Sequence, residues 1–139
     1  MPKHTKSTSI NSKSFIRAYA AALFWAAVIL VLISLPGEDL PDFDIWAIDI
    51  EDKMGHLGVF GLLAVLLIHG RYRRNGPLNR KELLIIFLIA TGYGAFTEIL
   101  QGLAFPTRFA SIPDFIADAL GALLGTIFGN LLIKYRRKS

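Results

Sequence analysis

Acidic, imidazole and amide side chains occur in pairs at helical spacing in this 139-residue chain. The pairs are Asp52 with His56, Glu98 with Gln101, and Asp114 with Asp118. Residues three or four apart lie on one face of an α-helix, so each pair points in one direction. Carboxylates near an imidazole can take up and return protons during a reaction. The candidate catalytic residues are therefore His56, Asp52, Glu98, Asp114 and Asp118.

Side chains suited to holding a ligand lie close to these pairs. Lys53 adjoins Asp52, while Arg108 and Ser111 precede the third pair. A guanidinium can bind phosphate or carboxylate through two parallel hydrogen bonds, whereas an ammonium acts as a point charge. The candidate ligand-binding residues are Lys53, Gln101, Arg108 and Ser111.

A metal site is an alternative use of the same residues. His56, Glu98, Asp114 and Asp118 would supply one nitrogen and three carboxylates, a donor set that suits a hard or borderline divalent ion. The chain has no Cys and no H-E-x-x-H motif. We therefore assign no metal ligand and no cofactor from the sequence.

Each of these acids also has a purely structural explanation. Glu98 and Asp118 could form interhelical salt bridges with a nearby cation, although loss of hydration opposes the Coulomb attraction of a buried pair. Asp52 and Asp114 could be acids at helix N-termini, where the helix dipole favours negative charge. Convergence of the side chains in space would favour a functional site.

Four apolar runs must position these side chains. Hydrophobic residues make up 53% of the chain and charged residues 19%. The runs lie at residues 18–35, 54–70, 83–105 and 112–133. At about 1.5 Å per residue, each run approaches the roughly 30 Å thickness of a bilayer core. We therefore predict an all-α, integral-membrane four-helix bundle that forms a single domain over residues 1–139.

Basic residues indicate the orientation of the four spans. Of the 15 Lys and Arg, all except Lys53 and Arg108 lie in the N-terminal segment, the loop after the second span, or the tail. With four spans, these segments share one side of the membrane, which the positive-inside rule places in the cytoplasm. We therefore predict that both termini are cytoplasmic (N-in/C-in). The basic residues are expected to contact membrane lipids, not nucleic acid.

Two further patterns concern local packing. Phe43, Trp46, Ala47 and Ile50 recur at helical spacing in the acidic first loop, which indicates a short interfacial helix, although a strand-like alternation is also present. Small residues recur every four positions on the last two spans, which lets helices approach closely in lipid. These stripes are Ala90, Gly94, Glu98 and Gly102, and Ala117, Gly121, Gly125 and Gly129. We expect the third and fourth spans to form a close antiparallel pair, with a homodimer face as the alternative.

The polar residues, in their order and spacing, resemble those of the VanZ-like family, from about residue 34 to residue 129. The matching residues are Asp52-Lys53-x-x-His56-x-x-x-Phe60, Glu98-x-x-Gln101, Arg108, and Ser111-x-x-Asp114-x-x-x-Asp118-x-x-Gly121-x-x-x-Gly125. Members are small multi-span bacterial membrane proteins, and the founding member is associated with resistance to the glycopeptide teicoplanin. The resemblance implies a place in the bacterial cytoplasmic membrane. Asp118 stands where the family usually has Asn, which adds an acid to the site.

Two functional hypotheses follow. The first is a non-catalytic envelope protein of the glycopeptide response, whose outward-facing polar pocket binds a head group, a lipid-linked cell-wall precursor or another envelope protein. The second is a membrane-embedded hydrolase or transferase that acts on a lipid-linked precursor, with His56 and a carboxylate as acid and base. A transporter is disfavoured because the inner halves of spans two to four carry no acid. The sequence leaves the choice between binding protein and enzyme open, as it does the possibility of a homo-oligomer.

Overall fold

The chain folds into long α-helices in the computed structural model, which describes residues 12–34, 45–104 and 110–138. The helices are α1 (Ser12–Ser34), α2 (Ile45–Asn75), α3 (Arg80–Ala104) and α4 (Ile112–Arg136). Each is long and apolar enough to cross a membrane. The prediction of an all-α protein with four candidate spans is therefore confirmed.

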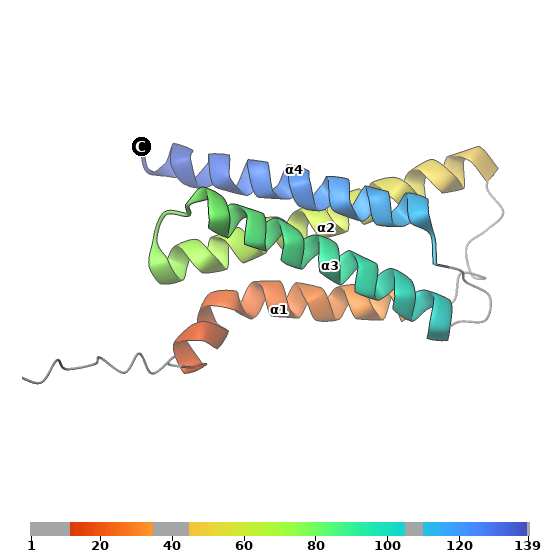
Figure 1. Ribbon diagram of the computed structural model, residues 1–139, viewed down its shortest axis with the longest axis horizontal. Helices are drawn as coiled ribbons and strands as arrows, with labels where there is room; N and C mark the ends of the chain where they lie inside the picture. The colour runs from red at the N-terminus through yellow and green to blue at the C-terminus, as the bar shows by residue number, and fades with distance from the viewer. Residues whose placement is uncertain (1–11, 35–44, 105–109, 139) are drawn as a thin grey trace, which may run out of the picture.

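The four helices run in alternating directions, so α1 and α3 point one way and α2 and α4 the other (Figure 1). One end of the bundle, where α3 ends and α4 begins, is called here the α3–α4 end. The opposite end, where α2 ends and α3 begins, is called the α2–α3 end. Among the side chains that the structure describes, all Lys and Arg except Lys53 belong to helix termini or turns at the α2–α3 end.

The helices extend beyond the apolar runs that predicted them. α2 begins at Ile45, well before residue 54, and therefore includes the segment expected to form a separate interfacial helix around Trp46. The prediction of helix there is confirmed for the backbone from residue 45, but the segment continues directly into α2. The side chains of residues 45–52, and Phe43, lie outside the described part of the chain.

Local hydrogen bonds define the turn between α2 and α3. Gly76 follows the last residue of α2 with φ of +76°, a conformation that costs glycine little, and its N–H donates to the Tyr72 carbonyl at 2.8 Å. Asn79 and Glu82 then form a reciprocal capping box at the start of α3. The Glu82 N–H donates to Asn79 Oδ1 at 3.0 Å, and the Asn79 N–H donates to Glu82 Oε2 at 2.9 Å.

The backbones of α2 and α4 approach each other closely. A Cβ added at Gly121 would collide with the Leu57 carbonyl, and one at Gly125 would collide with the Gly61 carbonyl. The two glycines of α4 therefore face a helix of the same chain, as expected, but this helix is α2 and not the predicted α3. α3 and α4 are antiparallel neighbours, as expected, and the Asp118 side chain fills the space beside Gly94.

Hydrogen bonds through aromatic side chains join α1 to the rest of the bundle. Trp25 Nε1 donates to the Val59 carbonyl of α2 at 2.9 Å. The Tyr93 hydroxyl of α3 donates to the Ala26 carbonyl of α1 at 2.7 Å. The apolar core around these contacts contains Ile29, Ile33, Phe60, Leu63, Ala64, Ala90 and Ala122. Many large apolar side chains of α1, α3 and α4 remain exposed, as expected of helices that face lipid.

Candidate functional site

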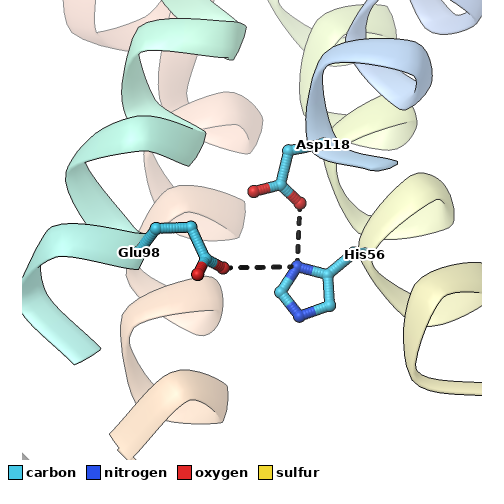
Figure 2. A group of neighbouring side chains, drawn as sticks. All are labelled: His56, Glu98 and Asp118. Atoms are coloured by element: carbon cyan, nitrogen blue, oxygen red, sulfur yellow. Dashed lines mark hydrogen bonds and ion pairs between the residues drawn. The ribbon is translucent and has the colours of Figure 1, made fainter. Parts of the chain in front are cut away.

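His56 of α2 and Asp118 of α4 meet near the α3–α4 end of the bundle. His56 Nδ1 lies 2.8 Å from Asp118 Oδ1, which is hydrogen-bond distance. The Asp118 side chain is 0% exposed and that of His56 is 17% exposed. With Asp118 ionised, the Nδ1–H donates to it, which leaves Nε2 as the acceptor nitrogen. Figure 2 shows Nε2 on the far side of the ring from both neighbouring carboxylates.

Glu98 of α3 completes a cluster drawn from three helices (Figure 2). Its Oε1 lies 3.9 Å from His56 Nδ1. Its Oε2 accepts a hydrogen bond from the Ser111 N–H at 2.9 Å. Glu98 is 4% exposed, and its Oε1 has no hydrogen-bond partner among the residues that the structure describes. This carboxylate oxygen is therefore directed at the imidazole and is able to accept a proton or a hydrogen bond from a ligand.

Glycines explain why these side chains can meet. Contact between Gly121 and the Leu57 backbone brings α4 against the turn of α2 that carries His56. Gly94 leaves room for the Asp118 side chain, since a Cβ at residue 94 would lie 2.9 Å from both Asp118 Cβ and Oδ2. The sequence indicated Gly94 only as part of a small-residue stripe. Its spacing of four from Glu98 was the signal that could have linked it to the site.

Ser111 and Asp114 define the start of α4. Ser111 is the N-cap residue, and its Oγ accepts a hydrogen bond from the Asp114 N–H at 3.3 Å. Asp114 lies in the first turn, where the helix dipole favours an acid. Because the Ser111 N–H also binds Glu98, the cap connects α4 to α3. The structural explanation of Asp114 as an acid at a helix N-terminus is therefore supported, and both residues border the cluster.

The remaining candidates lie around the cluster or outside the described chain. Gln101 is buried on α3, one turn from Glu98 toward the α3–α4 end, and Lys53 is half-buried on α2. The Asp52 side chain and Arg108 lie outside the described residues. A cavity of about 210 Å³ opens between α3 and α4, where Glu98 and Ser111 are its polar lining residues.

The cluster has a donor set that could hold a divalent ion. His56, Glu98 and Asp118 each offer one ligand atom, and these atoms lie within 4.8 Å of one another. Asp114, included in the metal set considered from the sequence, is not part of this group. An ion with bonds of about 2.0–2.2 Å would need His56 Nδ1 and Asp118 Oδ1 to separate by several tenths of an ångström, because their 2.8 Å spacing is that of a hydrogen bond.

The arrangement is suited to proton transfer. A buried carboxylate that accepts the Nδ1–H fixes the imidazole tautomer in which Nε2 is the nitrogen that takes a proton, as when a carboxylate orients a histidine base.

The site also lies within the candidate spans. Glu98 lies six residues before the end of α3, and Asp118 six residues after the start of α4. Each is thus about 9 Å along its helix from that end.

Among comparisons with known proteins, a family model matches this chain. No curated protein and no solved structure matches this chain. The family model described as VanZ/LLP1 matches residues 3–133, which is nearly the whole chain and includes every residue of the cluster. The match agrees with the resemblance read from the polar residues. The chain therefore belongs to the VanZ/LLP1 family.

Proposed function

We propose that this chain is a multi-pass protein of the bacterial cytoplasmic membrane with both termini in the cytoplasm. The distribution of charge supports the orientation, because the described Lys and Arg other than Lys53 gather at the α2–α3 end. The His56 cluster would then lie below the outer surface of the membrane. An amphiphile in the outer leaflet could place its head group there.

We further propose that the protein is a membrane-embedded enzyme that cleaves or transfers the head group of an envelope lipid, such as a lipid-linked cell-wall precursor. The observation that carries this proposal is the 2.8 Å contact between His56 Nδ1 and the fully buried Asp118. This contact fixes the ring so that the second imidazole nitrogen lies on the far side from both carboxylates (Figure 2), which is the orientation in which a carboxylate supports a histidine base.

The proposed reaction is attack of water or a hydroxyl on an ester or phosphoester. His56 Nε2 takes the proton of the attacking O–H, and the attacking oxygen forms a bond to the carbonyl carbon or phosphorus. The bond to the leaving oxygen breaks, and this oxygen receives the proton from the imidazolium. Asp118 positions the ring and stabilises its positive charge. The cavity between α3 and α4 reaches the cluster at Glu98.

A binding role without catalysis is the second candidate, and the Glu98 contact with the Ser111 N–H favours it. This bond uses one carboxylate oxygen of the cluster to hold the start of α4, as expected of a rigid recognition site. In this case the protein would contribute to the glycopeptide response by holding an envelope ligand or partner protein. Teicoplanin carries a lipid tail and acts at the outer face of the membrane, so the location would be suitable.

Turnover by the purified full chain distinguishes the two roles. The protein in lipid nanodiscs is incubated with a lipid-linked cell-wall precursor, and products are identified by mass spectrometry. We expect product from the unaltered protein and from His69→Ala, the matched control, because His69 is exposed on α2 nearer the α2–α3 end. We expect at least a hundredfold loss for His56→Ala. Precursor binding without product would favour the binding role, and full turnover by His56→Ala would refute catalysis by this histidine.

A further inference from the structure

A second cavity lies in the other half of the bundle, away from the His56 cluster. It has a volume of about 560 Å³ and lies between α1 and α3, with α2 as its floor. Its walls are apolar side chains, among them Leu23 of α1, Leu67 of α2, and Ile85 and Ile89 of α3. The cavity is open along one side, so it forms a groove on the lipid-facing surface. We call it the α1–α3 groove.

The length of the α1–α3 groove matches one leaflet of a bilayer. On α3 its lining begins at Glu82 and ends at Tyr93, and on α1 it extends from Phe15 to Ala26. Eleven residues of helix cover about 16 Å, or roughly half of a 30 Å hydrocarbon core. The Tyr93 hydroxyl closes the inner end by donating to the Ala26 carbonyl at 2.7 Å. A chain that entered from the α2–α3 end would therefore stop near the middle of the membrane.

The open end of the groove is basic. Arg71 lines it and forms an ion pair with Glu82. The Arg74 guanidinium lies 5.2 Å from the centroid of the Phe15 ring, another lining residue. Glu82 balances Arg71, and Arg74, which lies over the lining residue Phe15, adds a positive charge at the mouth of the groove. An arginine held over an aromatic ring at the depth of lipid head groups is well placed to bind a phosphate.

We propose that the α1–α3 groove is a binding site for one anionic phospholipid of the leaflet at the α2–α3 end. An acyl chain fills the apolar groove, and the head-group phosphate contacts Arg74. The shape of the groove selects for an acyl chain, and the charge at its mouth selects for an anionic head group over a zwitterionic one. The bound lipid would also fill the gap between α1 and α3, which contact each other directly at Tyr93 and Ala26.

Native mass spectrometry of the full chain in detergent, titrated with phosphatidylglycerol or with phosphatidylcholine of the same acyl chains, tests the site. Ile85→Trp and Ile89→Trp fill the groove, whereas Leu84→Trp and Leu88→Trp add the same bulk to neighbouring exposed positions that do not line it. We expect at least tenfold weaker phosphatidylglycerol binding for the groove variants and unchanged binding for the controls. Equal binding by both sets would overturn the proposal.

Two further comparisons test the wall and the charge separately. Leu23 of α1 lines the groove, whereas its neighbour Phe24 does not. The variants Leu23→Trp and Phe24→Trp therefore repeat the test from the α1 side if the α3 variants fail to fold. Arg74→Gln should reduce the preference for phosphatidylglycerol over phosphatidylcholine to within twofold, whereas Arg73→Gln, an exposed neighbour, should preserve it. Equal loss in both arginine variants would show diffuse surface attraction and would refute a defined phosphate contact.

Discussion

Asp118 is completely buried within a candidate membrane span, where an ionised carboxylate is costly unless it accepts hydrogen bonds. The contact with His56 offsets part of this cost. It also restricts the imidazole to one orientation, since the Nδ1–H has a fixed acceptor. One hydrogen bond thus links the stability of the bundle at this depth to the orientation of the His56 ring.

Two substitutions of Asp118 should differ in their effect on stability. Asp118→Asn retains an oxygen that can accept the Nδ1–H of His56, and Asn is the residue that the family resemblance places here. Asp118→Ala leaves a buried donor without an acceptor, which costs about 1–3 kcal/mol. We expect the free energy of unfolding, measured by SDS titration in mixed micelles, to fall by this amount for Asp118→Ala and by less than half of it for Asp118→Asn. Equal losses would show that the hydrogen bond contributes little.

Gly94→Ala should disturb the cluster without altering an ionisable group. The added Cβ would lie 2.9 Å from Asp118 Cβ and Oδ2, so either Asp118 or the α3 backbone must shift. We expect a loss of about 1–3 kcal/mol in the free energy of unfolding. We also expect a change in the ¹⁵N chemical shifts of the His56 ring. The control is Gly92→Ala on the same helix, where a Cβ meets nothing within 4 Å. It should leave the ¹⁵N shifts unchanged and leave stability unchanged or raise it by up to about 1 kcal/mol.

The three residues of the cluster were among the candidates from the sequence, but their pairing was not predictable. His56, Glu98 and Asp118 were among the five catalytic candidates because carboxylates and an imidazole recur at helical spacing in the sequence. Helical spacing, however, fixes only which residues of one helix share a face. The contact between His56 and Asp118 depends on which helix packs most closely against α4. That choice depends on the sizes of the side chains that both α2 and α3 present to α4.

The contact between α2 and α4 also shows what the sequence could not predict, here at the level of whole helices. A stripe of glycines predicted that α4 would approach a neighbour closely, and it does so through Gly121 and Gly125. The short connection favoured α3 as that neighbour. α2 is the actual partner because Gly61 presents bare backbone to α4, whereas α3 faces α4 with the Glu98 carboxylate and accommodates the Asp118 side chain at Gly94.

Enlarging a glycine in this contact should destabilise the whole bundle. In Gly125→Ala the added Cβ would collide with the Gly61 carbonyl, which is rigid helical backbone. We expect a loss of about 1–3 kcal/mol in the free energy of unfolding, or more if the two helices cannot separate. Gly58→Ala on α2 is the control, since a Cβ there meets nothing within 4 Å. It should leave stability unchanged or raise it by up to about 1 kcal/mol.

The molecule as a whole combines an apolar surface with charge segregated to one end. Large apolar side chains remain exposed along α1, α3 and α4, and each helix is long enough to span a bilayer. The described basic side chains, Lys53 apart, belong to the α2–α3 end, while the cluster of His56, Glu98 and Asp118 lies toward the other. The two ends therefore have different chemistry, and orientation decides which compartment the cluster faces.

Single cysteines can report this orientation in intact cells, because the natural chain contains no Cys. Ala110→Cys lies at the α3–α4 end and Asn75→Cys at the α2–α3 end, in both cases at exposed positions. The positive-inside rule predicts that an impermeant thiol reagent labels Ala110→Cys from outside. It should label Asn75→Cys only after the membrane is permeabilised. Gel-shift labelling with a maleimide-linked polymer measures both, with the Cys-free chain as the blank.

The reverse labelling pattern would contradict the proposed orientation and change both proposals in a defined way. The His56 cluster would then face the inner leaflet, so an externally acting glycopeptide could not reach its ligand there. The α1–α3 groove would open to the outer leaflet, although its selectivity for an anionic head group would persist, because Arg74 and Phe15 define its mouth whichever side it faces. Labelling thus tests the compartment of each site, whereas turnover and lipid titration test their chemistry.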